Sequence, residues 1–264
     1  MCFKRIIYAL LYNNGEFHLS RNFRLQKVGD INWLKNNFGF GETCDFIDEL
    51  MILNVTRNSD EKDKKKFLND VNKLREKIFV PITLGGGIRS LNHAKLYFEN
   101  GADKVMINYL SHSDKQICQS IANIFGDQAL SVMVDYKIIE NHIVTFINGG
   151  KEKSYDFKEY IEQLKSFQFG ELILNSINND GTGYGFDEDI VKLIPNTLKN
   201  PILLMGGAGK PEHFYEILKH KKVAGAVTAN LFNFLGNGLE LSRNFSIEKG
   251  IKIIQFSNIN EKNI

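Results

Sequence analysis

The amino-acid sequence predicts an α/β fold: a single (β/α)₈ barrel, or TIM barrel, built from two similar halves. Its length of 264 residues is typical of one such barrel. Short apolar runs alternate along the chain with longer amphipathic segments, which favours a parallel sheet covered by helices. The composition does not shift sharply at any point, so we expect one barrel domain over residues 1–264.

Eight segments are strand candidates. Each is four to eight residues long, is rich in Ile, Leu and Val, and lacks a regular alternation of polar and apolar residues. Strands of a parallel sheet are covered on both faces and have this composition. The candidates are Arg5–Tyr12, Glu49–Val55, Val80–Leu84, Lys104–Ile107, Ala129–Asp135, Glu171–Asn175, Ile202–Met205 and Ala224–Thr228.

Segments of helical length lie between these strands, as a βα repeat requires. One stretch, residues 138–151, departs from the pattern. Val144, Phe146 and the turn sequence Asn148-Gly149-Gly150 predict a small β-hairpin inserted there, after the fifth strand. The expected helices include Asp60–Ile78, Ser90–Asn100, Ser113–Phe125, Asp156–Phe167 and Pro211–Lys219.

The second half of the chain resembles the first. Pro81–Gly87 aligns with Pro201–Gly207 at a displacement of 120 residues, and the strand starting at Asp48 resembles the one starting at Gly170. Half of a barrel is four βα units, so a repeat of this length fits a barrel made by duplication. Duplication predicts two equivalent sites at opposite edges of the C-terminal face.

Composition excludes several functional classes. There are 33 basic and 31 acidic residues, so the chain has no strong field for nucleic acid or an anionic membrane. Three cysteines are too few and too scattered for a disulfide framework, and no two histidines have helical ligand spacing. The first residues lack the pattern of a signal sequence, and the longest apolar runs are shorter than a membrane span. We therefore expect a cytoplasmic protein without metal or cofactor.

Two glycine clusters, Gly86-Gly87 and Gly206-Gly207, follow predicted strands and precede predicted helices. Without a Cβ atom, glycine lets main-chain N–H groups turn toward an anion, and the following helix adds its positive dipole end. The alternative is that these glycines only permit tight turns. Two clusters in repeat register favour phosphate binding, and two facing sites would fit a bisphosphate.

Loops after the seventh and eighth strands commonly hold phosphate in such barrels. Here those loops contain Gly206, Gly207, Ala229 and Asn230. The matching loops of the first half supply Gly87 and Asn108. The sequence therefore predicts two phosphate sites, one in each half.

Two aspartates lie where barrel enzymes keep acids and bases. Asp135 ends the fifth predicted strand, and Asp180 follows the sixth. An isolated aspartate is more often a helix cap or a partner in a salt bridge. Since both residues belong to the same face as the phosphate loops, we expect them to be catalytic.

Four charged residues begin predicted strands: Arg5, Glu49, Lys104 and Glu171. Charges near a barrel axis are costly unless they are paired. Two cations and two anions around the N-terminal opening can neutralise one another. On spacing alone, the favoured interpretation is a structural ion network that closes the bottom of the barrel.

Five groups of residues occur in order over nearly the whole chain: Lys4–Ile7, Gly85–Ile88, Gly101–Val105, Asp180–Thr182 with Gly185, and Gly206–Phe214. Together they resemble HisF, the cyclase subunit of imidazole glycerol phosphate synthase. The resemblance implies a barrel that docks a HisH-type glutaminase on its N-terminal face. Ammonia then crosses the barrel and attacks a phosphorylated substrate, a bisphosphate, which yields imidazole glycerol phosphate and an aminoimidazole carboxamide ribotide.

The resemblance also implies roles for single positions. Asp135 matches the catalytic acid of the fifth strand, Asp180 a further acid of the active site, and Asp103 a residue of the docking face. Arg5, Glu49, Lys104 and Glu171 match the salt-bridge gate through which ammonia enters, which overturns the purely structural interpretation. The phosphate-binding positions are matched by Gly87 and Asn108 at one site and by Gly181, Gly207 and Ala229 at the other.

Other positions depart from the family. Leu11 stands where the family has a second catalytic aspartate, and Leu19 stands where it has a lysine. Asn54 replaces an aspartate, and Asn230 replaces a phosphate-loop serine. Leucine cannot transfer a proton, and loss of a general acid or base costs about 10²–10⁴ in rate.

These departures leave an alternative open. They resemble a divergent branch associated with surface-sugar genes, in which HisF-like and HisH-like proteins supply ammonia to a sugar amidotransferase that makes acetamidino groups. Such a protein keeps the ammonia gate and the glutaminase partner but need not cyclise a substrate. The two hypotheses differ in whether ammonium and a bisphosphate are turned over.

Overall fold

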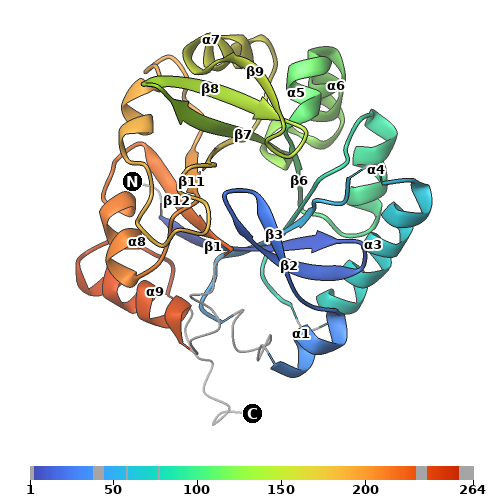
Figure 1. Ribbon diagram of the computed structural model, residues 1–264, viewed down its shortest axis with the longest axis horizontal. Coiled ribbons are helices and arrows are strands. Elements are labelled where there is room, and N and C mark those ends of the chain that lie inside the picture. The colour runs from blue at the N-terminus through green and yellow to red at the C-terminus, as the bar shows by residue number, and fades with distance from the viewer. Residues whose placement is uncertain (1–2, 38–44, 58, 77, 230–236, 256–264) are drawn as a thin grey trace.

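A computed structural model describes residues 3–37, 45–57, 59–76, 78–229 and 237–255. Eight parallel strands form a closed barrel in which each strand pairs with the next and β12 pairs back to β1 (Figure 1). The predicted (β/α)₈ fold is confirmed. The barrel strands are β1 Arg5–Asn13, β4 Glu49–Asn54, β5 Ile82–Gly85, β6 Lys104–Ile107, β7 Leu130–Ile139, β10 Glu171–Ser176, β11 Ile202–Met205 and β12 Val223–Thr228.

The barrel strands are apolar on both faces because each face has its own covering. In β1, Ile6 and Tyr8 belong to the core between strands and helices, whereas Ile7 and Ala9 belong to a second cluster inside the barrel. Alternate side chains therefore enter different apolar layers. This arrangement explains why the strand sequences lack polar alternation.

Helices cover the outside of the barrel (Figure 1). None of the described helices is long and apolar enough to cross a membrane. Several begin at a side-chain cap; Asp60 caps α3 in a reciprocal capping box with Asp63. The helices are α1 Ile31–Asn37, α3 Glu61–Arg75, α4 Leu91–Glu99, α5 Tyr109–Ser113, α6 Lys115–Phe125, α7 Phe157–Gln163, α8 Pro211–Leu218 and α9 Gly238–Glu248.

Some expected helices have different bounds. The expected helix Asp60–Ile78 ends as α3 at Arg75. The expected helix Ser113–Phe125 starts later, because Asp114 is extended and caps α6 with its carboxylate. The last turn of the expected helix Asp156–Phe167 is a 3₁₀ turn, Leu164–Ser166. Fraying and capping at helix ends account for these differences.

The fifth barrel strand continues beyond the barrel. β7 runs past Asp135 and turns back as β8, His142–Ile147, which pairs antiparallel with β9, Glu152–Asp156. The expected turn at residues 148–150 lies between β8 and β9. A second turn, missed in the sequence, lies between β7 and β8, where Asn141 has a φ of 67°.

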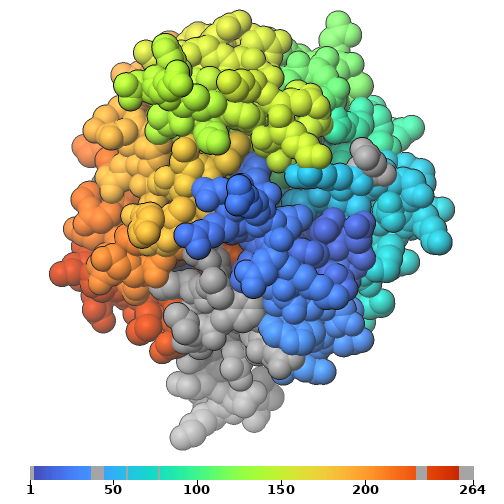
Figure 2. Space-filling view, in the orientation of Figure 1, coloured from blue at the N-terminus to red at the C-terminus, as the bar shows by residue number. Residues whose placement is uncertain are grey.

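A hairpin after β1 was not predicted. β1 pairs antiparallel with β2, Glu16–Arg21, which pairs with β3, Arg24–Gly29. The turn into it contains Gly15, at a φ of 92°, in an Asn-Gly pair. In the space-filling view, the blue atoms of this N-terminal region lie across the centre of the face shown (Figure 2). The hairpin therefore covers the C-terminal mouth of the barrel.

Candidate functional site

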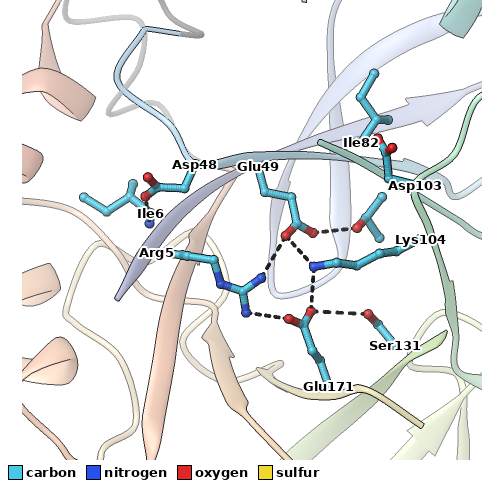
Figure 3. A network of polar contacts seen from close by, with 10 residues as sticks. Arg5, Ile6, Asp48, Glu49, Ile82, Asp103, Lys104, Ser131 and Glu171 are labelled. Atoms are coloured by element: carbon cyan, nitrogen blue, oxygen red, sulfur yellow. Dashed lines mark hydrogen bonds and ion pairs between the residues drawn. The ribbon is translucent and has the colours of Figure 1, made fainter. Parts of the chain in front are cut away.

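A ring of four charges lies at the N-terminal opening of the barrel, where each residue begins its strand (Figure 3). Arg5 donates to Glu49 Oε2 at 3.0 Å and to Glu171 Oε1 at 2.5 Å. Lys104 Nζ donates to Glu49 Oε2 at 2.7 Å and to Glu171 Oε2 at 3.1 Å. Each cation thus bridges both carboxylates, and the four predicted residues meet in one closed ring.

Two hydroxyl groups complete the ring and were missed in the sequence. Thr83 Oγ1 donates to Glu49 Oε1 at 2.5 Å, and Ser131 Oγ approaches Glu171 Oε2 at 3.5 Å (Figure 3). With these contacts, all four carboxylate oxygens have a donor. Full pairing offsets the cost of burying charge.

Above the ring, the barrel interior is apolar. Its lining consists of aliphatic residues together with four methionines, whose thioether side chains are flexible and can adjust to a passing molecule. A neutral molecule crosses such a column at lower cost than an ion. The lining residues are Ile7, Ala9, Leu11, Met51, Leu53, Met106, Met133, Ile173, Leu203, Met205 and Val227.

Asp135 lies at the upper end of this column and is buried. Asn175 Nδ2 donates to its Oδ1 at 2.8 Å, and Asn108 Nδ2 donates to its Oδ2 at 3.1 Å. Burial raises the pKa of Asp135 to about 7, and the bond from Asn175 opposes this rise. A group with this pKa can both donate and accept a proton near neutral pH.

Asp180 lies beneath the tip of the β2–β3 hairpin. Its Oδ2 accepts from Ser20 Oγ at 2.5 Å and from the Phe23 main-chain N–H at 3.0 Å, and its carbonyl accepts from Asn22 N–H at 2.9 Å. Burial raises the pKa of Asp180, and the two bonds to its carboxylate oppose that rise. In this conformation Asp180 anchors the hairpin over the mouth.

The clustered glycines do not have equal surroundings. A Cβ on Gly86 would lie 1.9 Å from the Asn54 carbonyl oxygen, and one on Gly207 would lie 1.9 Å from the Gly185 carbonyl oxygen. Close main-chain packing therefore requires glycine at both positions, in agreement with the interpretation that these glycines permit tight turns. Gly206 is similar, because a Cβ there would lie 2.7 Å from a carbonyl oxygen. Gly87 differs, because a Cβ there would meet nothing within 3.6 Å.

A small hollow lies at the second predicted phosphate site. Ser20, Asp180, Gly181, Gly207 and Ala229 are among its lining residues. The hairpin closes it from above, since a Cβ on Gly181 would lie 2.1 Å from the Ser20 carbonyl oxygen. Asn230, also expected at this site, lies outside the described residues. In this conformation the hairpin therefore covers the predicted phosphate site.

Residues 44–237 match the family described as "Histidine biosynthesis protein". The chain belongs to this family. A relative from Parasynechococcus marenigrum (strain WH8102), named as the hisF2 subunit of imidazole glycerol phosphate synthase, is 44% identical over 241 residues, 91% of this chain and 89% of the relative. HisF subunits of that synthase from Prosthecochloris aestuarii and Sulfurisphaera tokodaii are each 32% identical over 255 residues, 96% of this chain and 99% of the relative. The chain is HisF-like, as its motifs predicted.

Position 11 of this HisF-like chain is fully part of the apolar interior. Leu11 pairs in register with Leu53 and belongs to the inner cluster of the barrel. Asn54, the next departure, accepts the Thr56 N–H at 3.1 Å through its Oδ1. Position 11 therefore adds an apolar side chain to the interior and supplies no carboxylate, whereas Asp135 has amide partners.

Two predicted residues make contacts that the sequence did not indicate. Asn108 directs its side-chain amide to Asp135, so any phosphate contact there falls to main-chain groups. Asp103 is exposed near the gate, and its Oδ2 accepts the Ile82 N–H at 2.8 Å (Figure 3). Asn175, the second amide on Asp135, was missed as a site residue. Within the described ranges, no three His, Cys, Asp or Glu side chains form a metal site.

Proposed function

We propose that this chain is the synthase subunit of a glutamine amidotransferase of the imidazole glycerol phosphate synthase type. It takes ammonia from a HisH-type glutaminase at its N-terminal face and adds it to a bisphosphate at the C-terminal face. One observation carries the proposal: a closed ring of paired charges lies under an apolar column that ends at a protonatable carboxylate.

The charge ring, the apolar interior above it and the polar groups around Asp135 follow one another in an order that suits the passage of ammonia. Opening one bond of the charge ring admits a small molecule, and the apolar column favours neutral ammonia over ammonium. At the top, Asn175 Oδ1 is buried and has no hydrogen-bond partner among the described residues. It can accept an N–H of the arriving ammonia, while Asp135 exchanges protons with the substrate during cyclisation.

The N-terminal face also has apolar groups suited to a partner. Phe79 is 96% exposed in the segment that leads into β5, and Phe3 is 56% exposed just before β1. Ile254 follows Ile253, which pairs with Lys4 beside β1, and is also exposed. Large exposed apolar groups around a polar centre are typical of a protein interface. Together with Asp103 they support docking of the glutaminase there.

A second candidate function has one observation in its favour. Leu11 stands where the family has its second catalytic aspartate, so cyclisation lacks one of the two proton carriers that the resemblance implies. In this candidate the chain activates the glutaminase and passes ammonia to a sugar amidotransferase that forms acetamidino groups. The names of the relatives give it no support, and they favour the synthase.

The test is turnover of the bisphosphate substrate by the purified chain, first with an ammonium salt and then with glutamine and a HisH-type glutaminase. The synthase proposal expects both imidazole glycerol phosphate and the carboxamide ribotide, formed by a stable complex of the two subunits. A glutaminase complex without any cyclised product would support the second candidate. If neither complex nor product forms, both are wrong.

A further inference from the structure

Polar side chains surround the position beside Gly87 where a Cβ atom would lie. A Cβ placed there would lie 3.6 Å from Ser59 Oγ, 3.9 Å from the Tyr97 hydroxyl and 4.0 Å from Lys64 Cε. The matching space at Gly207 is filled by the Gly185 carbonyl. The two halves of the barrel therefore differ at the very position where their sequences agree.

Lys64 brings a positive charge to this space. The residue is only 6% exposed, although it lies in the first turns of α3. Its Nζ is 2.7 Å from Glu61 Oε1, on a side chain that is 66% exposed. A buried ammonium group is costly unless an anion pairs with it, and a partner so open to water can be replaced by an anionic ligand.

His93 faces Lys64 and presents a second donor. The Arg89 main-chain N–H donates to His93 Nδ1 at 3.2 Å, so in the neutral ring the proton is on Nε2. Burial and the charge of Lys64 both lower the pKa of His93, which favours the neutral ring. His93 Nε2 and Lys64 Nζ are 3.1 Å apart.

Two donors this close need a common acceptor. Glu61 Oε1 fills that place, at 2.7 Å from Lys64 Nζ and 3.6 Å from His93 Nε2. A phosphate oxygen has the same charge and accepting capacity as this carboxylate oxygen. A phosphate oxygen could therefore occupy the position that the Glu61 carboxylate oxygen now holds between Lys64 and His93.

The other half keeps the histidine, but the cation that acts on it, Lys210, is exposed rather than buried. The Gly209 main-chain N–H donates to His213 Nδ1 at 3.1 Å, as Arg89 does to His93. In the repeat, however, Gly209 takes the place of Arg89. The first-half site has a buried cation, whereas the second-half site is built from glycine main chain.

We propose that Lys64, assisted by Ser59 and His93, binds the phosphate at Gly87 and makes this the stronger of two unequal anion sites. The inference rests on the proposed phosphorylated substrate. A phosphomonoester dianion gains most from a buried ammonium group. The substrate is thereby held in one orientation, although the two halves of the barrel are alike.

The test uses calorimetric titration with inorganic phosphate, with ribose 5-phosphate and, as a control for the sugar, with ribose. Lys64→Met keeps the apolar stem and removes the charge, and we expect it to weaken the tighter phosphate site about tenfold or more. Lys65→Met is the matched control: Lys65 is exposed on the same helix, and its substitution removes the same charge. It should change affinity less than about twofold.

Two further variants guard against a folding defect. Lys64→Arg should restore most of the affinity, and Ser59→Ala, in a loop, should weaken phosphate binding about threefold through one lost hydrogen bond. Equal phosphate affinity in the wild type and a folded Lys64→Met variant would overturn the inference, as would equal losses in Lys64→Met and Lys65→Met. Phosphate binding does not depend on ammonia transfer, so failure of the proposed function would leave this result intact.

Discussion

Asp135 is a buried carboxylate whose hydrogen-bond partners are side-chain amides. Asn108 and Asn175 each donate to one of its oxygens, and burial raises its pKa to about 7. Its position at the end of a predicted strand was enough to select it from the sequence. The amide partners were not predictable in this way, because Asn175 meets Asp135 through the pairing register of β10 with β7.

The raised pKa makes a prediction about stability. An unfolded Asp135 titrates near pH 3.8, so between about pH 4 and 7 the folded protein holds a proton that the unfolded chain has lost. The free energy of unfolding should therefore fall as pH rises through this window and level off above it. Relative to Asp135→Asn, which has no such proton, the total fall is at most about 4 kcal/mol.

Urea unfolding of the wild type and Asp135→Asn between pH 4.5 and 8 measures this difference. Groups other than Asp135 titrate in both proteins, so their contributions cancel in the comparison. Parallel pH curves would mean that Asp135 is ionised throughout the range. It could then no longer donate a proton at neutral pH.

The β2–β3 hairpin is the element that sequence analysis missed. β2 is mostly half-buried and β3 is mostly exposed, so these short strands carry little of the apolar pattern that identified the barrel strands. The Asn14-Gly15 pair is a hairpin signal. The barrel strands were predicted because two apolar layers constrain their composition, whereas the hairpin is held by a few polar contacts at its tip.

Those contacts predict how readily the hairpin opens. Ser20→Ala removes the hydroxyl that donates to Asp180. This change should lower the free energy of opening the hairpin by about 1–2 kcal/mol. Amide exchange at Asn22 and Phe23, whose N–H groups donate to Asp180, should then be about tenfold faster.

Hydrogen–deuterium exchange of the hairpin peptide measures this opening. Ser166→Ala, which removes an exposed hydroxyl bonded within its own turn, is the control and should leave that peptide unchanged. If exchange in Ser20→Ala equals that of the wild type, Asp180 does not hold the hairpin through Ser20. Its role at the mouth would then have to be sought in the substrate.

At the scale of the molecule, the barrel has a ring of ion pairs at its N-terminal end and a buried carboxylate, Asp135, toward its C-terminal end. Duplication accounts for the shared strand and glycine positions, such as Glu49 with Glu171 and Gly86 with Gly206, whose φ values are 92° and 94°. The sequence therefore predicted which residues share an end. It did not predict the differences between the halves, because these depend on what fills the space beside Gly87 and Gly207.

In the proposed function the charge ring is the gate for ammonia, and a change at Arg5 tests this proposal. Arg5→Ala removes two of the four ion pairs of the ring and leaves Glu49 and Glu171 held together by Lys104 alone among the ring cations. We expect a loss of about 1–3 kcal/mol in stability, because the carboxylates lose a charged partner. We also expect looser control of ammonia entry.

The readout is the ratio of product formed to glutamine hydrolysed in the complex with the glutaminase. If the wild-type ring opens only to a docked glutaminase, the ratio should be near one. In Arg5→Ala we expect ammonia to escape and the ratio to fall. Turnover with added ammonium salt should change little, since the chemistry at Asp135 is untouched. Lys219→Ala, which removes an exposed ion pair on α8, serves as the control. An unchanged ratio in a folded Arg5→Ala complex would mean that ammonia does not pass the ring, because a gate with half its bonds removed cannot retain the same selectivity.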